Sequence, residues 1–383
     1  MVKRKRIALN YQVDYDSSAG IVIYIQNLVK GFALLEDRIQ PELLIIYSES
    51  SPIEEIKELN YKYINFYCYK PIRNSFLKKA INKLSRELTG KNIIRRYDFP
   101  DESTLLYPYF YCTETHHFKS RMYWKPDFQE MYYPNFITTK ELDFVKDYLN
   151  EARIHPKYEI VFSSEDSLND YKKFFSPFEN IVKVMKFVSI LPKLPTTDST
   201  YIRNKYSLPE KYFIIANQFW PHKNHQLVFE AIVKVREKYP DVCIACSGKQ
   251  TSYRDGNYFQ NLQNFILQNN LQNNVVFLGF IPRIDQLLLI RNAQAVIQPS
   301  LFEGWSTVIE DCKALGQFVL ASDLKVNIEQ SNQNILFFNQ NNAKELANAI
   351  EKVLAGQVDR SPYDYTKNIN KFADDLINVF DLN

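Results

Sequence analysis

The fold of this 383-residue sequence is decided by the stretch Gln298-Pro-Ser-Leu-Phe-Glu-Gly-Trp-Ser-Thr-Val-Ile-Glu-Asp-Cys-Lys-Ala-Leu-Gly316. Residues 295–298 form an apolar run that predicts a short buried strand. A turn that contains Gly304 then leads into residues 305–315, whose apolar positions recur at helical spacing and stop at a glycine. A strand that passes through a tight turn into a helix is the repeating unit of a parallel α/β sheet.

The same alternation of strands and helices continues on both sides of this stretch. In the second half, the pattern predicts strands at 212–216, 242–246, 275–278, 295–298, 318–321 and 335–338, separated by helices at 222–239, 259–267, 286–291, 305–315 and 343–354. The first half is looser, with a helix that follows Gly20 and strands predicted at 7–9, 43–47, 105–107, 122–124 and 160–164. The Pro- and Thr-rich residues 192–200 indicate a linker. We therefore expect two Rossmann-like α/β/α domains that face each other across a cleft, residues 1–190 and 191–365, and a C-terminal helix in residues 366–383 that packs back on the first domain.

Glycine is scarce, with 9 among the 383 residues, when a usual frequency of about 7% would give roughly three times as many. No G-x-G occurs, so the dinucleotide-binding fingerprint is absent, and so is the phosphate loop of P-loop NTPases. Gly248, Gly279 and Gly304 each follow a predicted strand, at the carboxyl edge of the sheet, and Gly20 has the matching place in the first half. Ordinary turns explain any one of them, but the set indicates backbone that approaches a ligand closely.

Charge and cysteine content exclude several other classes of protein. The net charge is only +3, so bulk electrostatics does not indicate a nucleic-acid-binding protein. The five cysteines are dispersed, as expected of reduced thiols in a cytosol, and the pair Cys243 and Cys246 lies in a predicted buried strand. We predict neither a signal peptide nor a membrane span, and no cluster has metal-ligand spacing. The sequence thus predicts a cytoplasmic protein that needs no metal or cofactor.

The stretch around Glu303 resembles the donor-site motif of retaining, family-4 glycosyltransferases of the GT-B fold. Their pattern is P-S-x-x-E-G-[aromatic], with seven residues between two acids and then a helix that ends at glycine. Three other segments resemble parts of the same family. Asn217 to His225 is similar to its lysine-bearing phosphate loop. Trp124 to Gln129, with Pro134, is similar to the first-domain loop that faces the acceptor, and Phe162 to Ser164, with Asp170, to the segment before the chain crosses between domains.

The resemblance implies a site for a nucleotide-diphosphate sugar in the second domain. The helix that starts near Trp305 would direct free backbone N–H groups at the diphosphate, with the hydroxyls of Ser306 and Thr307 beside them. Lys223 would stabilise the departing diphosphate, and Glu303 would accept hydrogen bonds from sugar hydroxyls. The remaining donor-binding positions are Gly20, Asn217, Gln218, His222, Gly248, Gly304 and Asp311.

One first-domain acid, Asp127, is expected to face the donor sugar across the cleft. The resemblance places it where it could orient the acceptor hydroxyl or stabilise positive charge at the anomeric carbon. An Asp that caps the turn after Pro126 is an equal alternative. The pair His116 and His117 is a further candidate for acceptor binding, and His225 is expected to be a helix residue.

Two positions depart from the family pattern. The second acid falls on Asp311, where the family has a glutamate, and a glutamate lies one place earlier at Glu310. A helical wheel places Asp311 at the edge of the apolar side and Glu310 opposite it, so we expect Asp311 to reach the ribose hydroxyls and Glu310 to face water. Gln218 replaces an arginine that the family often has, which leaves His222 or water to compensate.

One segment carries the positive charge. Between Lys70 and Arg96 the sequence has nine basic residues and a single acid, a local charge of +8 that leaves −5 for the rest of the chain. Within it, Phe76 to Leu88 is a helical pattern with one apolar side and a polar side that carries Lys78, Lys79, Lys83 and Arg86. Such a helix usually packs on the core and exposes its charges. The excess of charge also fits a helix at an anionic membrane surface, and both interpretations stay open.

The resemblance implies a retaining hexosyltransferase, and the basic segment places it at the inner face of the cytoplasmic membrane. It would move a sugar from a nucleotide-diphosphate sugar to a lipid-linked glycan in lipopolysaccharide or capsule synthesis. A nucleotide-sugar epimerase of the same architecture is one alternative, and it would act with no acceptor present. A non-catalytic subunit of a polysaccharide assembly complex is the other. The sugar, the base, the acceptor, the linkage and the oligomeric state are not identified, although backbone near Gly279 to Pro282 is a candidate for base binding.

Overall fold

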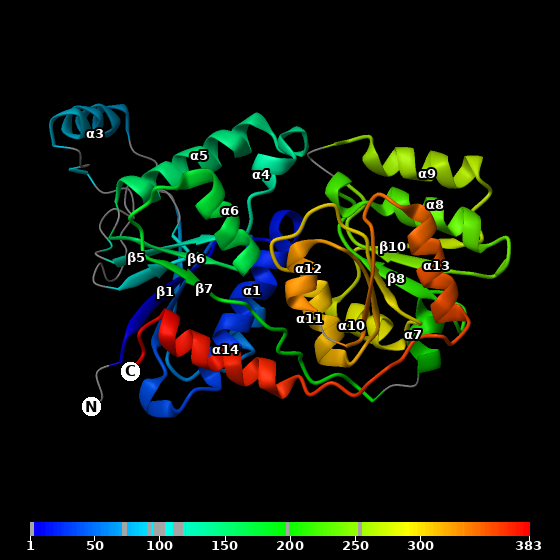
Figure 1. Cartoon of the computed structure of the whole chain (residues 1–383). Coiled ribbons are helices and arrows are strands. Elements are labelled where there is room, and N and C mark those ends of the chain that lie inside the picture. The colour runs from blue at the N-terminus through cyan, green and yellow to red at the C-terminus, as the bar shows by residue number, and fades with distance from the viewer. Residues whose placement is uncertain are drawn as a thin grey trace.

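The structure is a computed structural model that describes residues 4–70, 75–89, 93–94, 104–109, 118, 120–155, 157–196, 199–251, 255–331 and 333–383. The predicted acceptor candidates His116 and His117 lie outside these residues, and so does the side chain of Arg86. Figure 1 shows two α/β domains side by side, with the C-terminal helix running beneath the first of them.

The first domain contains a parallel sheet in the order β3-β2-β1-β4-β5-β6-β7. Its strands are β1 (Arg6–Tyr11), β2 (Glu42–Tyr47), β3 (Ile64–Cys68), β4 (Leu105–Tyr107), β5 (Ser120–Lys125), β6 (Glu159–Phe162) and β7 (Val182–Val184). Its helices are α1 (Tyr15–Ala33), α2 (Ile53–Lys57), α3 (Phe76–Thr89), α4 (Gln129–Tyr132), α5 (Thr139–Ile154) and α6 (Glu165–Phe175). The alternation in β1 covers both faces: Ile7 and Leu9 pack in one apolar cluster and Ala8 in another.

The second domain repeats the arrangement with a parallel sheet in the order β10-β9-β8-β11-β12-β13. Its strands are β8 (Phe213–Ala216), β9 (Ile244–Ser247), β10 (Val275–Gly279), β11 (Val296–Gln298), β12 (Val319–Ser322) and β13 (Ile335–Phe338). Its helices are α7 (Ser199–Lys205), α8 (His225–Val235), α9 (Tyr258–Gln268), α10 (Arg283–Asn292), α11 (Thr307–Leu315), α12 (Lys325–Gln330) and α13 (Ala343–Leu354). The strand order reverses between β8 and β11, and ligands of such sheets bind beyond the carboxyl ends at that point.

The chain crosses between the domains twice. After β7 it passes into the second domain, and after α13 it returns as α14 (Thr366–Val379), which packs on α1. The contact is close because Gly31 of α1 has no side chain: a Cβ there would lie 2.6 Å from Cδ1 of Leu376. Phe372 and Leu376 are thereby part of the first domain's core (Figure 1).

A carboxylate joins the two domains directly. Glu329 of α12 accepts hydrogen bonds from the backbone N–H groups of Glu165 (2.8 Å) and Asp166 (3.1 Å), at the amino end of α6. Lys186, in the first crossing segment, pairs with the same carboxylate at 2.8 Å. A negative charge at a helix amino end is stabilised by the unpaired N–H groups and the helix dipole, so this contact fixes α12 of the second domain on α6 of the first.

One expectation about local structure is wrong. Gly20 does not precede the first helix at the end of a strand, since α1 already begins at Tyr15 and contains Gly20 in its second turn. The polar residues after β1 form the first turn of the helix, where hydroxyl and acidic side chains are favourable.

Candidate functional site

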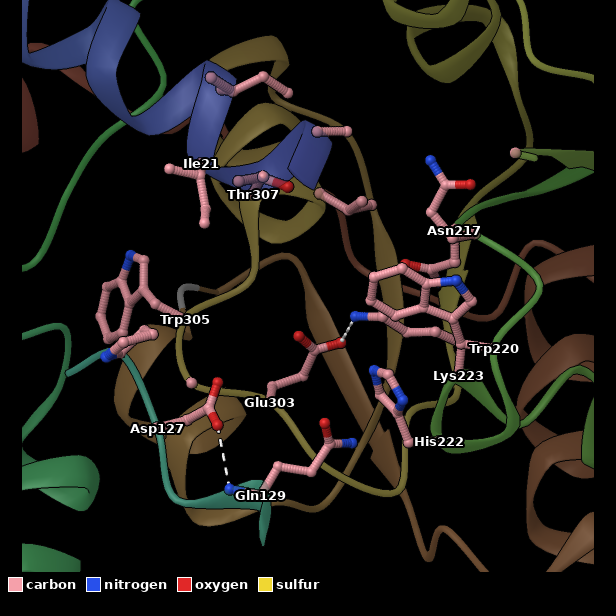
Figure 2. A pocket seen from close by; sticks show the side chains of 18 of the residues that line it. Ile21, Asp127, Gln129, Asn217, Trp220, His222, Lys223, Glu303, Trp305 and Thr307 are labelled. Carbon is pink, nitrogen blue, oxygen red and sulfur yellow. Dashed lines mark hydrogen bonds and ion pairs between the residues drawn. The ribbon is translucent and has the colours of Figure 1, made fainter. Parts of the chain in front are cut away.

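A cavity of about 980 Å³ lies between the two domains, at the carboxyl ends of both sheets. Its wall includes eleven of the residues predicted from the sequence, namely Gly20, Asp127, Asn217, Gln218, His222, Lys223, Gly248, Glu303, Gly304, Trp305 and Thr307. Ser306 and Asp311 are the two predicted residues that are not part of the wall. Figure 2 shows how Asp127, Lys223, Glu303 and Trp305 surround the same space.

The centre of the cavity is an ion pair between the two loops at the reversal of strand order. Lys223 ends a short 3-10 helix (Pro221–Lys223) after β8, and Glu303 follows β11. The ammonium nitrogen Nζ of Lys223 lies 2.7 Å from Oε1 of Glu303, as the dashed line in Figure 2 indicates. Asn224 then takes a left-handed conformation (φ 54°) that turns the chain from this loop into α8.

The carboxylate of Glu303 is fixed through one of its two oxygens. Besides Lys223, its Oε1 accepts hydrogen bonds from Nε2 of Gln298 (2.7 Å) and Oγ of Ser300 (2.6 Å). Gln298 is itself held by Nδ2 of Asn217, which donates to its Oε1 at 2.9 Å. No described residue donates to Oε2 of Glu303, so that oxygen can accept hydrogen bonds from a ligand.

The amino end of α11 adjoins this carboxylate. Thr307 begins the helix and lines the cavity, while Ser306 is the N-cap, whose hydroxyl accepts from the backbone N–H of Ile309. Because the Ser306 hydroxyl caps the helix from a buried position, it serves the helix rather than the cavity wall. The unpaired N–H groups and the positive end of the helix dipole make this end a favourable place for an anion.

Two glycines allow loops to meet where side chains could not. A Cβ on Gly304 would lie 2.6 Å from the carbonyl oxygen of Pro126 and 2.7 Å from Cβ of Asp127. Gly248 has φ +150°, and a Cβ there would lie 2.0 Å from the carbonyl oxygen of Asn217. At both positions there is no room for a Cβ, so only glycine allows these contacts. The contact of Gly304 with Pro126 and Asp127 joins the two domains.

Asp127 caps a turn and also lines the cavity. Its Oδ1 accepts a hydrogen bond from the backbone N–H of Gln129 at 3.0 Å, which caps the turn into α4. The residue also lines the cavity beside Gly304, and Figure 2 shows its carboxylate between Trp305 and Gln129. The indole of Trp305 donates to the carbonyl oxygen of Phe187 at 2.9 Å, which ties the motif to the first crossing segment.

The prediction that Glu310 faces water is wrong. Its side chain is 1% exposed and accepts from Lys313 (2.8 Å), Gln330 (2.9 Å) and the hydroxyl of Tyr365. The helical-wheel argument assumed that α11 packs only against the sheet, so that the side opposite its apolar residues faces water. The returning chain at Tyr365 and helix α12 cover the opposite side, so both acids of α11 are buried.

Asp311 is buried beside the cavity. Its Oδ1 accepts from Nη2 of Arg283 at 2.5 Å and from the hydroxyl of Ser189, while its Oδ2 is buried and has no hydrogen-bond partner among the described residues. Arg283, which the sequence analysis missed, is the first residue of α10 and does line the cavity. The position directly after Gly279 to Pro282 was its only signal in the sequence. The partly buried Lys30 of α1 is nearby, and its partial burial together with the charge of Arg283 lowers its pKa to about 8.

Two further candidates of the second domain, Gln218 in the cavity wall and His225 outside it, have structural contacts. Oε1 of Gln218 accepts from the backbone N–H of Lys249 at 2.8 Å, so it holds the loop that contains Gly248. His225 begins α8, is fully buried and stacks on Phe219 with 4.3 Å between ring centroids. Burial, with the nearby charge of Lys223, lowers its pKa to about 3, so it is neutral near pH 7. The expectation that His225 is a helix residue is confirmed.

Comparison with known proteins supports the predicted fold. The family model described as "Glycosyl transferases group 1" matches residues 198–372, which contain β8 to α13 and thus Lys223 and Glu303. HepE from Anabaena, solved in complex with UDP and glucose, matches with a TM-score of 0.65 over 98% of this chain and 94% of its own, at 16% identity. WaaG, a glycosyltransferase involved in lipopolysaccharide biosynthesis, matches with a TM-score of 0.56 over 98% of this chain and 95% of its own, at 11% identity. The prediction of a GT-B fold is confirmed.

A curated relative matches part of the sequence. The O-antigen chain mannosyltransferase RfbU of Salmonella typhimurium is 25% identical over 158 residues, which are 40% of this chain and 41% of RfbU. The similarity therefore spans about two fifths of the relative's length. Within the described part of the chain, no helix is long and apolar enough to cross a membrane, and no three His, Cys, Asp or Glu side chains are grouped as a metal site.

Proposed function

We propose that this protein is a glycosyltransferase that moves a sugar from a nucleotide-diphosphate sugar to a glycan acceptor in surface polysaccharide synthesis. The single observation that carries the proposal is the convergence of Lys223, Glu303 and the amino end of α11 in one interdomain cavity. The cavity volume is at the upper end of the range of small-molecule sites. The group 1 model over residues 198–372, the O-antigen role of RfbU and the UDP and glucose bound to HepE support the same class.

The chemistry follows from the charges. The diphosphate would lie between the ammonium group of Lys223 and the N–H groups at Thr307, which together stabilise the negative charge that develops as the anomeric C–O bond breaks. Glu303 would hold the sugar hydroxyls through Oε2, since Oε1 already has three donors. The acceptor oxygen would form the new bond to the anomeric carbon and pass its proton to the departing diphosphate.

Asp127 would position the acceptor on the first-domain side. Because its Oδ1 is held by the backbone of Gln129, the carboxylate has a fixed direction in the cavity. Attack on the face that the diphosphate leaves would retain the anomeric configuration, and no protein nucleophile would then be needed. With Lys223 and α11 to neutralise the diphosphate, we expect transfer to continue in the presence of a chelator of divalent metals.

The ribose would contact Asp311, as the sequence predicts, through its buried Oδ2, which must become accessible from the cavity when the nucleotide binds. Thr307 and Val308, one turn earlier on α11, line the cavity, and a buried acceptor without a donor needs a ligand or water to satisfy it. A lipid-linked acceptor and a location at the inner face of the cytoplasmic membrane are further parts of this proposal, and they depend on α3.

Nucleotide binding tests the proposal most directly. Thermal unfolding would be followed with UDP, GDP, ADP and TDP, since a ligand of the folded state raises stability by RT ln(1 + [L]/Kd). At least one of them should raise the unfolding temperature of the wild type, and Lys223→Met should abolish most of that rise. Lys238→Met, in an exposed ion pair of the same domain, is the matched control. No shift with any of the four would contradict the proposal.

Activity separates the alternatives. Glu303→Gln should reduce transfer by at least about a hundredfold, of the order of losing one well-placed electrostatic group. An epimerase would convert the donor sugar with no acceptor present. A non-catalytic subunit would bind a nucleoside diphosphate, yet cellular glycan would be unchanged by Glu303→Ala.

A further inference from the structure

Helix α3 packs in the reverse of the usual way. Figure 1 shows α3 projecting from the first domain, away from both sheets. The side that is buried is polar: Asn82 and Ser85 are 2% and 4% exposed. The amide of Asn82 makes two hydrogen bonds of 2.8 Å with the backbone of Ile94, one as donor and one as acceptor. A paired amide of this kind anchors the helix through its polar side.

The apolar side of the same helix is exposed to water. The exposed fractions are 87% for Phe76, 73% for Leu77, 42% for Ile81, 62% for Leu84 and 78% for Leu88. Large apolar side chains at helical spacing normally face a core, and their continuous exposure marks a surface that binds something. The interpretation of α3 as a helix that packs its apolar side on the core is therefore wrong.

The charges around this apolar side identify the kind of partner. Lys78, Lys79 and Lys83 are all exposed and lie on the polar side of the helix, with Lys83 next to Phe76 at the border of the apolar side. Lysines in that position can extend their ammonium groups to an anionic surface while the apolar residues insert beneath it. A second copy of α3 would bring like charges together, so self-association through this surface is disfavoured.

We propose that α3 is a membrane-docking helix, which inserts its apolar side between the headgroups of an anionic bilayer with Lys78, Lys79 and Lys83 on the lipid phosphates. The helix is too short and too charged to span a bilayer, and it lies in the interface plane. The two hydrogen bonds between Asn82 and Ile94, on the opposite side of α3, fix the helix to the chain that follows it.

The orientation of the docked protein determines how a lipid-linked acceptor would reach the cavity. This step alone rests on the proposed function. In Figure 1, α3 and α5 lie along the same edge of the first domain, and Phe144 and Val145 of α5 line the cavity. Phe144 of α5 lines the cavity and is 56% exposed, so one side of its ring is available to an apolar chain. A lipid-linked glycan held in the bilayer would reach Asp127 past α5.

Vesicle co-sedimentation of the full chain tests the docking. We expect binding to vesicles of phosphatidylcholine with 30% phosphatidylglycerol, and weak binding to phosphatidylcholine alone. Replacing Lys78, Lys79 and Lys83 with Glu should reduce the partition coefficient at least about a hundredfold, since each lysine near an anionic surface contributes about a fivefold factor. Leu77→Ser with Leu84→Ser and Leu88→Ser should abolish binding while leaving the lysines in place.

The matched control reverses three exposed lysines far from α3 in the sequence, Lys344 and Lys352 of α13 and Lys367 of α14, to Glu. It makes the same change in net charge and should leave vesicle binding within a few-fold of the wild type. Thermal unfolding shows whether each variant still folds, because the Asn82–Ile94 anchor and the cavity are untouched.

Three results would overturn the docking proposal: equal binding to neutral and anionic vesicles, unchanged binding of both α3 variants, or a dimer in solution that the serine variant dissolves. Its failure is distinguishable from failure of the proposed function. If the protein binds anionic vesicles but no nucleoside diphosphate, the docking proposal holds and the glycosyltransferase proposal is wrong. If it binds a nucleoside diphosphate but not the vesicles, the docking proposal is wrong and the glycosyltransferase proposal holds.

Discussion

Gly304 of the second domain and Asp127 of the first approach so closely that a Cβ on the glycine would lie 2.7 Å from Cβ of the aspartate. The carbonyl oxygen of Pro126 is equally near, at 2.6 Å. The loop of Pro126 and Asp127 therefore touches the loop of Glu303 and Gly304 in the wall of the cavity. Under the proposed function, the distance between an acceptor oriented by Asp127 and a sugar held by Glu303 would depend on this contact.

Gly304→Ala should separate the two loops. The added methyl group meets backbone on the Pro126 side, which cannot move aside as a side-chain end can, so the loops must shift by several tenths of an ångström or more. We expect transfer to fall at least about tenfold, because small displacements of reacting groups are costly. Gly256→Ala is the control, since its Cβ would meet no atom within 4 Å. Equal kinetic constants for wild type and Gly304→Ala would contradict the role of this contact.

Gly20→Ala should move stability and donor affinity in opposite directions. Gly20 lies inside α1 with open space around its Cβ position, so alanine should stabilise the helix by about 0.5–1 kcal/mol. The same methyl group projects from a residue that lines the cavity, and it should weaken binding of a nucleotide-diphosphate sugar several-fold. Thermal unfolding and a donor titration on the same sample measure the two effects. A rise in stability with unchanged affinity would remove Gly20 from the donor site.

The parts of the site that could be predicted from the sequence are those fixed by local structure. Lys223 and Glu303 lie in loops that follow β8 and β11, and the carboxyl ends of neighbouring parallel strands meet at one edge. The motif and its position directly after a strand were therefore enough to predict that these two residues lie close together. The scarcity of glycine made Gly248 and Gly304 recognisable, and both are needed for close backbone contacts.

The rest depended on contacts between segments far apart in the sequence. The burial of Glu310 comes from Tyr365, 55 residues later, and Arg283 joins the site because Asp311 holds its guanidinium. A helical wheel has no information on either contact. Edge strands β3 and β7 were also missed, since their side chains are mostly half-buried and the apolar signal is weak. The core-packing interpretation of α3 failed for a similar reason, because the periodicity of a helix does not say what covers its apolar side.

Deoxynucleotides can show whether Asp311 holds the ribose. If Oδ2 accepts a ribose hydroxyl, then the 2′- or 3′-deoxy form of the preferred nucleoside diphosphate should bind the wild type about tenfold more weakly than the ribose form does. Asp311→Asn should bind both forms with similar affinity, since its acceptor is gone or reoriented toward Arg283. Titration calorimetry of the four combinations gives the coupling directly. Full discrimination retained by Asp311→Asn would assign the ribose to another residue.

Lys30 predicts a pH dependence of stability. The side chain lies in α1 and donates to the carbonyl oxygen of Ile190 at 2.7 Å, at the first crossing between the domains. Burial and the nearby Arg283 lower its pKa to about 8 from 10.5, while Asp311 and Glu55 oppose the shift. Between those two pKa values the unfolded chain binds more protons than the folded one, so this residue's contribution to the free energy of unfolding rises with pH across that window.

The difference in free energy of unfolding between the wild type and Lys30→Met should therefore change in favour of the wild type from pH 8 to pH 10, by at most about 1.4 kcal/mol per pH unit. Urea unfolding of both proteins at pH 7, 8, 9 and 10 measures it, and the comparison cancels the titration of other groups. Lys344→Met, at an exposed position of α13, should differ from the wild type by a constant amount. Below pH 8 the difference for Lys30→Met should be flat as well, because Lys30 is then charged in both states. A flat difference across the whole range would mean that Lys30 keeps an ordinary pKa in the folded protein and that the crossing segment leaves it accessible to water.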